Sequence, residues 1–395
     1  EPGESSLFVT GNPFTQKIHL PTGKQRIWPL IEPSNYKDAY SRNKLRKDIG
    51  QSIGFCKDWQ GQYWISTEYR LLIRVDPKTG QQVQFSLREY MSDSLPSETK
   101  KLAIPWDMRA WDESTLLLAN RKGLWLFDYR KQELKPFPVS PDFADIQQQE
   151  IFRIQPSQSN RQEWWLCTGN GLYMLDMPSQ KIVRHAYPKG KGADQLPVSI
   201  ITHLYEQSAD TCWVTSRGSG LIRWNPQTGA WKQYTRKDGL SDNTIYAVYP
   251  DDYGYLWMSS DKGIMRFDPK TETTIFYLCE DGVSHEEFNT QSHFKDEEGN
   301  IYFGSLNGVT AFHPKDLLGE LKPTNITISE LLFQDRTTGK LYSRAENPQK
   351  GEPLILKPSD LGFFMRLGML DYQYSKDAQY RYRILGIDQQ WNVLE

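Results

Sequence analysis

Cysteine is scarce in this chain, which has four among 395 residues: Cys56, Cys167, Cys212 and Cys279. Disulfide frameworks are typical of short, cysteine-dense secreted domains. We therefore interpret the four as small apolar side chains within strands, and they do not settle the redox compartment. No run of about 20 apolar residues occurs, so the sequence predicts no membrane-spanning helix.

An excess of charge of one sign is also absent, because 47 basic and 49 acidic residues leave a net charge of −2. A nucleic-acid-binding face would require a basic surplus, so we expect no nucleic-acid partner for this region. The first residues have neither a basic start nor an apolar stretch, and we expect no signal peptide. We interpret both ends of the chain as cut.

Motifs that carry chemistry are few. The six histidines include no pair at metal-ligand spacing, and no nucleophile elbow or phosphate loop occurs, so we expect no metal, no cofactor and no catalytic residue. The adjacent carboxylates Asp251 and Asp252 would point apart in a tight turn and make a poor glycosidase pair; Asp252 is interpreted as a turn residue. His203 and His293 fall in expected innermost strands, where they could face a channel or be hydrogen-bonded structural histidines.

Aromatic residues, by contrast, are plentiful at 13% of the chain, and they recur in a repeat. Each unit has an Asp-x-x-Gly turn, an aromatic run that ends in Thr or Ser, a second run after a glycine, and an Asp-Pro-x-Thr-Gly turn. The clearest copy spans 252–269, and an earlier copy spans 58–80. Short apolar and β-branched runs bounded by Gly, Asp and Pro predict strands.

Seven copies follow one another, with anchor residues 44–56 positions apart. The anchors are Phe8, Trp64, Leu117, Trp165, Trp213, Trp257 and Tyr302. This period predicts an all-β fold, a seven-bladed β-propeller over residues 1–320, with the Trp and Tyr anchors packed between blades. Two units depart from the pattern. The unit at 117 lacks both Trp and Asp-x-x-Gly, and the first unit lacks an innermost strand before Leu7.

A different pattern begins after residue 318. Alternating runs at 323–333, 361–367 and 380–385 predict strands, with a loop or ragged hairpin at 334–352. Short alternating strands with polar turns are typical of an immunoglobulin- or fibronectin-like β-sandwich. We expect residues 321–395 to be the first part of such a sandwich.

Taken in this order, the motifs resemble a known family. The repeat unit is similar to the two-component-regulator propeller repeat, the stretch 281–314 resembles the closing blade of that family's membrane-proximal propeller, and the Tyr-rich segment 370–391 resembles the sandwich that follows it. The family is the periplasmic sensor region of Bacteroidetes-type hybrid two-component histidine kinases. The resemblance implies a membrane-anchored protein whose extracytoplasmic part detects an oligosaccharide, signals to a kinase and transcriptional output, and forms a homodimer through the sandwich.

Two other functions stay open: a propeller enzyme that acts on polysaccharide as a lyase or glycosidase, and a scaffold for protein contacts or dimerisation. Turnover of a glycan would indicate the first, and dimerisation without a ligand response would indicate the second.

A ligand site would lie on the propeller face that carries the loops between second and third strands, because function concentrates on loops held by a rigid scaffold. From these loops we select Arg, Lys and Asn side chains that can bind sugar hydroxyls or acidic groups, and we add two residues of the irregular unit's innermost strand. For each residue, a solvated surface side chain is the alternative. The candidate ligand-binding residues are Arg70, Trp106, Arg109, Arg121, Asn170, Arg217, Lys262 and Asn307.

Overall fold

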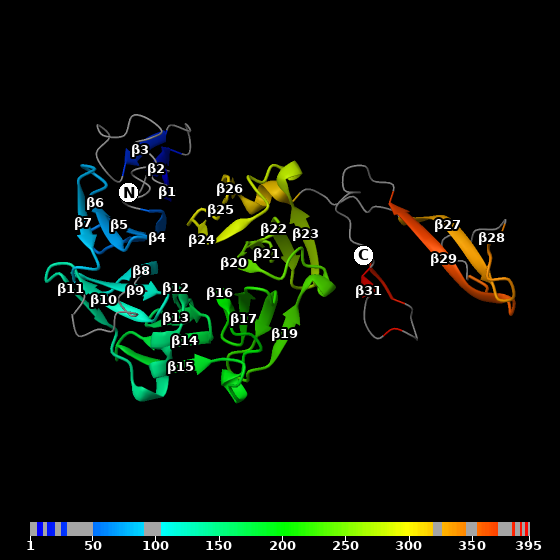
Figure 1. Ribbon diagram of the computed structural model, residues 1–395, viewed down its shortest axis with the longest axis horizontal. Helices are drawn as coiled ribbons and strands as arrows, with labels where there is room; N and C mark the ends of the chain where they lie inside the picture. Colours follow the sequence, from blue (N-terminus) through cyan, green and yellow to red (C-terminus); the bar gives the residue numbers. More distant parts are fainter. Residues whose placement is uncertain are drawn as a thin grey trace. The chain divides into compact units, whose positions relative to one another are not determined.

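The computed structural model describes residues 6–10, 14–19, 25–29, 50–90, 104–318, 326–344, 354–369, 381–383, 388 and 392–393. The chain divides into two compact units, Glu1–Pro314 and Lys315–Glu395. In the first unit, antiparallel sheets stand around a common centre (Figure 1).

Seven sheets make up the described part of the first unit. Their strands are β1 (Ser6–Thr10), β2 (Phe14–His19) and β3 (Gln25–Pro29); β4 (Ser52–Lys57), β5 (Tyr63–Thr67), β6 (Leu71–Val75) and β7 (Gln82–Ser86); β8 (Pro105–Ala110), β9 (Thr115–Asn120), β10 (Leu124–Asp128) and β11 (Glu133–Pro136); β12 (Ile151–Pro156), β13 (Glu163–Thr168), β14 (Gly171–Asp176) and β15 (Lys181–Ala186); β16 (Ile201–Ser208), β17 (Thr211–Ser216), β18 (Leu221–Trp224) and β19 (Trp231–Tyr234); β20 (Ile245–Pro250), β21 (Leu256–Ser260), β22 (Ile264–Asp268) and β23 (Thr273–Tyr277); and β24 (Phe288–Lys295), β25 (Ile301–Ser305) and β26 (Gly308–Phe312). Short 3-10 helices join or follow the sheets: η2 (Pro141–Gln148), η3 (Gly192–Asp194), η4 (Arg236–Asp238), η5 (Cys279–Asp281) and η6 (Pro314–Leu317).

The first strand of each sheet from the second to the seventh lies at the centre of the ring (Figure 1). Neighbouring inner strands contact one another, as β4 contacts β8 and β16 contacts β20. The first unit is therefore a seven-bladed β-propeller, as the repeat predicts.

Blade one begins differently from the others. In the second blade, the second strand β5 contacts β8, the inner strand of the third blade. In the same way, β1 of the first blade contacts β4, the inner strand of the second blade. β1 therefore occupies a second-strand position, and the described part of this blade holds no innermost strand. The unit around Leu117, irregular in sequence, is a regular four-stranded blade in which Leu117 is fully buried.

The Asp-x-x-Gly turn fastens the aromatic anchor of its own blade. Asp58 Oδ2 accepts a 2.8 Å hydrogen bond from Trp64 Nε1, and Asp251 Oδ2 accepts one of the same length from Trp257 Nε1. The other carboxylate oxygen of each aspartate accepts backbone N–H bonds within the turn. Asp252 is an exposed residue of this turn, as the sequence suggested, and the carboxylate that holds Trp257 is that of its neighbour Asp251.

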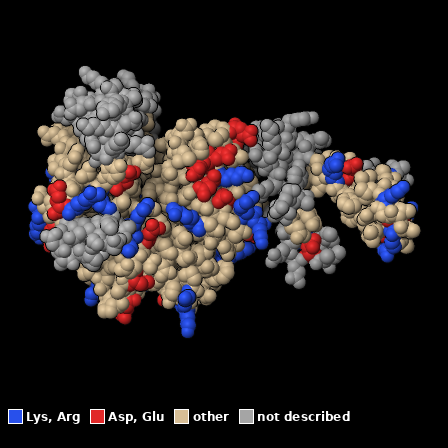
Figure 2. Space-filling model, viewed as in Figure 1, with Lys and Arg blue, Asp and Glu red and all other residues tan. Residues whose placement is uncertain are grey.

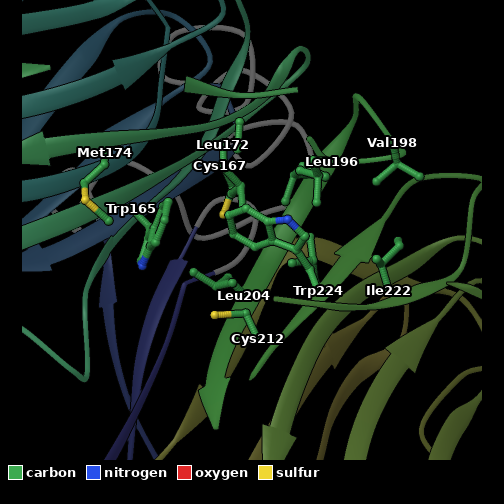
Figure 3. Close-up of a cluster of buried hydrophobic side chains, with 13 residues drawn as sticks. Trp165, Cys167, Leu172, Met174, Leu196, Val198, Leu204, Cys212, Ile222 and Trp224 are labelled. Atoms are coloured by element: carbon green, nitrogen blue, oxygen red, sulfur yellow. The ribbon is translucent and has the colours of Figure 1, made fainter. Parts of the chain in front are cut away.

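The core lies between the blades. Trp165 of β13 and Trp224 of β18 meet edge to face with ring centroids 6.1 Å apart, and aliphatic side chains of both blades surround them (Figure 3). The four Trp anchors are at most 2% exposed, which confirms that they are core residues. A fully buried aromatic side chain contributes about 1.5–3 kcal/mol of transfer free energy, so these contacts hold neighbouring blades together.

Three cysteines also lie in these strands. Cys56, Cys167 and Cys212 are buried and free, and burial raises the pKa of each thiol to about 12. Cys279 differs from the prediction, because it is exposed in η5 and lies outside a strand.

The second unit holds a three-stranded antiparallel sheet of order β28-β27-β29, with β27 (Ile326–Asp335), β28 (Leu341–Ser343) and β29 (Asp360–Met369), and a short pair, β30 (Arg381–Tyr382) with β31 (Asn392–Val393). Asp360 accepts hydrogen bonds from Tyr342 and Arg344, which ties β28 to β29. The predicted strands at 323–333 and 361–367 correspond to β27 and β29. The remainder of the expected sandwich falls largely outside the described residues and stays a prediction.

Candidate ligand site at the mouth of the propeller channel

Six inner strands carry a β-bulge at the same place. In β8, Pro105 pairs with Asn120 and Asp107 pairs with Ala119, so Trp106 is an extra residue in the ladder. Equivalent irregularities follow the first pair of β4, β12, β16, β20 and β24. A bulge interrupts the alternation of a strand and redirects a side chain. The start of each inner strand is thus able to point side chains where a regular strand could not.

The bulges lie at the same end of the blades as the loops between second and third strands. The pairing of Pro105 with Asn120 shows this, because the first residue of β8 faces the last residue of β9. Loop side chains and bulge side chains can therefore meet at one end of the central channel, which we call the mouth.

Aromatic rings and guanidinium groups meet at this mouth. The rings of Trp106 and Phe152, both bulge residues, have centroids 5.4 Å apart. The Arg121 guanidinium lies 5.2 Å from the Trp106 ring, and the Arg217 guanidinium lies 5.2 Å from the Phe152 ring. Arg217 Nη2 also donates a 3.1 Å hydrogen bond to Thr290 Oγ1 of β24. These five residues, with Asn120, are called the mouth cluster below.

A hydrogen bond crosses the channel beside this cluster. Gln291 Nε2, in the irregular stretch of β24, donates a 2.6 Å bond to the Phe152 carbonyl oxygen of β12. The two strands belong to the seventh and fourth blades, which lie far apart in the ring order. The irregular part of β24 is therefore joined to the bulge of β12 at this level.

Polar atoms in the mouth cluster lack partners among the described residues. The Asn120 side chain is 1% exposed, and neither its Oδ1 nor its Nδ2 makes a hydrogen bond; the same holds for the buried Trp106 Nε1. Buried polar groups are nearly always hydrogen-bonded. Asn120 pairs with Pro105, the residue before Trp106, so this acceptor and these two donors come from neighbouring strands at the mouth. Such groups suit a ligand that carries hydroxyl groups and apolar faces.

Below the mouth, polar side chains of five inner strands form what we call the channel layer. Its members are Asp107, Arg109, Arg153, His203, Tyr249 and His293. Asp107 pairs with Arg109 at 3.1 Å, and the Arg153 Nε lies 3.8 Å from its other oxygen.

The two histidines of the channel layer contact each other edge to face, with ring centroids 4.7 Å apart. Tyr249 Oη lies 2.7 Å from His293 Nδ1, and His203 Nδ1 accepts a bond from the Val248 N–H. Burial lowers the pKa of both imidazoles well below 6.5, and the charge of Arg153 lowers both further. Burial likewise raises the pKa of the Tyr249 phenol to about 12. These three groups are therefore neutral at neutral pH.

Three of the predicted site residues come together in the structure, namely Trp106, Arg121 and Arg217. Arg109 lies on the same strand as Trp106 but belongs to the channel layer, where it pairs with Asp107.

The other predicted residues lie in loops between second and third strands. Arg70 has a left-handed backbone with φ 66°, and its carbonyl accepts a bond from the Leu87 N–H. The Asn170 carbonyl holds His185 Nε2, while the Lys262 and Asn307 N–H groups bind serine hydroxyls. No described interaction joins the last three residues to the mouth cluster.

Phe152, Thr290 and Gln291 were missed by sequence reasoning, which also left Asn120 out of the selected residues. Phe152, Thr290 and Gln291 each lie near the start of an expected innermost strand. That position within the repeat was the available signal, since Trp106 was chosen from the same place.

Charged side chains are interspersed on the face of the molecule seen in Figure 2, with no continuous patch of one sign. Among the described residues, no group of three or more His, Cys, Asp or Glu side chains could hold a metal ion. In the described ranges no helix is long and apolar enough to cross a membrane.

Comparison with known proteins finds similarity in sequence and in fold. A family model described as "Two component regulator propeller" matches residues 239–262, which include β20, β21 and the Asp251 turn between them. The chain is thus similar to this family over one repeat of the propeller. It is also 24% identical over 245 residues to histidine kinase P4 from Formosa agariphila, a match that covers 59% of the chain and 17% of that kinase.

Among solved structures, the chain resembles the extracellular domain of a hybrid two component system from B. thetaiotaomicron, with a TM-score of 0.61 and 16% identity. The alignment covers 100% of this chain and 49% of that chain. The WD40 propeller domain of Doa1 also aligns, over 78% of this chain and 88% of that chain, at a TM-score of 0.49 and 7% identity. The chain thus spans less than half the length of these first two relatives.

Proposed function

We propose that this chain is the extracytoplasmic sensor region of a two-component signalling protein that is anchored in the inner membrane. The similarity to a histidine kinase and to the extracellular domain of a hybrid two component system supports this role. The kinase and the transcriptional output would belong to other parts of the protein.

The ligand in this proposal is an oligosaccharide bound at the mouth cluster. The observation that carries it is the group of unpartnered polar atoms of Asn120 and Trp106 beside the aromatic rings. Sugars present hydroxyl groups that both donate and accept hydrogen bonds, and they present C–H faces that pack on aromatic rings. The two arginines add donors in a fixed planar arrangement at the same opening.

A glycan panel tests this proposal by calorimetry and by thermal unfolding, because a ligand of the native state raises stability by mass action. Asn120→Ala should weaken binding of the glycan that stabilises the chain by at least tenfold, equivalent to about 1.4 kcal/mol. Its effect on stability should be small, because the amide makes no hydrogen bond with described residues. The control, Asn307→Ala, removes another loop asparagine outside the cluster and should leave binding unchanged. Equal loss in both variants would contradict a site at the mouth.

The enzyme alternative finds little support at this site. Glycoside hydrolysis requires two carboxyl groups across the scissile bond. Asp107 is occupied by two arginines and two backbone N–H groups, and Asp261 accepts a 2.5 Å bond from Tyr246 Oη. Release of shorter saccharides during the binding experiment would nevertheless favour an enzyme.

We also propose that the second unit mediates homodimerisation. Its strand β29 exposes Leu361, Phe363, Phe364 and Met365, and exposed apolar clusters commonly mark interaction surfaces. Light scattering should show a dimer that Phe364→Glu disrupts, while Glu330→Lys, on the neighbouring strand, leaves it intact. A monomer at all concentrations would contradict this part of the proposal.

A further inference from the structure

The channel layer holds more positive charge than its one carboxylate can balance. Asp107 Oδ1 accepts from the Met108 N–H and from Arg109, and Oδ2 accepts from the Ile154 N–H at 2.8 Å with Arg153 nearby. All four contacts of this carboxylate lie within the protein. Two guanidinium groups therefore face one fully engaged carboxylate, and a partly buried excess charge is costly unless it is paired.

Hydrogen-bond donors without acceptors also gather here. The buried Arg153 Nε has no hydrogen-bond partner among the described residues, and neither does His293 Nε2. His293 is 7% exposed, and its Nδ1 lies 2.7 Å from the Tyr249 hydroxyl. With that hydroxyl as the donor, the proton of the neutral ring is on Nε2. His203 Nδ1 accepts the Val248 N–H, so its Nε2 is likewise the protonated nitrogen.

These donors lie close together. The imidazoles of His203 and His293 are in contact, and strand β12, which carries Arg153, contacts both β16 and β24, which carry the two histidines. Gln155 lies two residues after Arg153 on β12. Its Oε1 is buried and is the acceptor nearest in sequence to Arg153 that lacks a hydrogen-bond partner among the described residues. Two buried donors without partners, Arg153 Nε and His293 Nε2, stand beside the protonated His203 Nε2 in a layer with a net positive charge. This set favours an acceptor-only occupant, and a small anion fits that description.

We propose that the channel layer is a binding site for a carboxylate-sized anion, held by Arg153 Nε and by the Nε2 atoms of His203 and His293. The carboxylate could be a free anion or the acid group of a uronate residue in a longer ligand. The second source rests on the proposed sensor function, whereas the first does not.

Two sets of additions to a chloride-free buffer at pH 7 test this site. The first set is formate, with chloride as a smaller anion. The second set is tetragalacturonic acid, with its fully methyl-esterified form as the uncharged control. The readouts are the Tm and the NMR shifts of the His Cε1 protons.

A carboxylate that occupies the site should raise Tm saturably by about 2–4 °C and should shift the His203 and His293 resonances. Arg153→Gln should abolish both responses, whereas Arg161→Gln, which removes an exposed arginine after the same strand, should retain them. If Arg153→Gln fails to fold, His203→Gln serves as the second variant, and the NMR shifts of the unmodified chain remain decisive.

The outcomes separate the two proposals. A response to formate indicates that the site binds a free anion. A response to tetragalacturonic acid but not to formate indicates that the site binds the acid group of a longer ligand. Binding of the ester as tightly as the acid, with no response to formate, would overturn the anion site while leaving the sensor proposal intact. No His shift with any carboxylate, or equal responses in Arg153→Gln and Arg161→Gln, would also overturn the anion site.

Discussion

Asp251→Ala should destabilise the propeller by about 3 kcal/mol. The carboxylate accepts three hydrogen bonds, from the backbone N–H groups of Tyr253 and Tyr255 at 2.9 Å and from Trp257 Nε1 at 2.8 Å. The Trp257 side chain is fully buried, so its unpartnered N–H should cost about 1–3 kcal/mol. The two backbone N–H groups of the turn can form hydrogen bonds with water instead, so the loss of each of their bonds to Asp251 should cost about 0.5–1 kcal/mol.

Asp252→Ala is the matched control, because Asp252 is the exposed neighbour of the same residue type. Exposed substitutions of this kind usually change the free energy of unfolding by less than about 0.5 kcal/mol. Urea denaturation followed by tryptophan fluorescence would measure both variants. In a Trp257→Phe background, Asp251→Ala should cost about 1–2 kcal/mol less, because no indole N–H remains to be left unpartnered. Equal stability of the two alanine variants would refute the role assigned to the Asp-x-x-Gly turn.

Three further predictions concern stability and thiol chemistry. His203 and His293 have folded-state pKa values below their unfolded value near 6.5, so protons bind first to the unfolded chain. Each histidine should reduce the free energy of unfolding by about 1.4 kcal/mol per pH unit as the pH falls below about 6.5. Urea denaturation at several pH values between 7 and 5 should therefore show a free energy of unfolding that falls less steeply with pH in the His203→Gln/His293→Gln variant. Gln132 has a left-handed backbone with φ 56° in the turn between β10 and β11, so Gln132→Gly should stabilise the chain by about 0.5–1 kcal/mol in urea, whereas Gln132→Ala should not. A thiol reagent should label Cys279 rapidly and the three buried cysteines only after unfolding; four rapid labels would contradict the described burial.

The architecture could be predicted because the repeat encodes local chemistry. The spacing from Asp58 to Gly61 fixes a turn, and the spacing from there to Trp64 places the anchor that the turn fastens. The same spacing to Gly254 places Asp251 at the position of Asp58, so the sequence also marks Asp251 as the residue that fastens Trp257.

The mouth cluster was only partly predictable, for a physical reason. A bulge depends on how two strands pair, and nothing in the letters around Phe152 or Thr290 marks an extra residue. The meeting of Arg217 with a residue of the fourth blade and one of the seventh depends on ring geometry. Sequence reasoning could place Arg121 and Arg217 on one face, but it could not separate them from Asn170 or Asn307 on that face.

The central claim is that the ligand binds at the mouth, and the indole resonances of the tryptophans test it directly. Titration of the ¹⁵N-labelled chain with the stabilising oligosaccharide should shift the Trp106 Nε1–H signal, assigned through Trp106→Phe, because that buried N–H has no partner among the described residues. The exposed Trp59 and Trp231 should remain unchanged. Trp59 lies in the turn between β4 and β5, at the end of the blade opposite the mouth, and Trp231 lies on the outermost strand of its blade. Shifts of Trp59 or Trp231 with an unmoved Trp106 would place the ligand elsewhere and contradict the account.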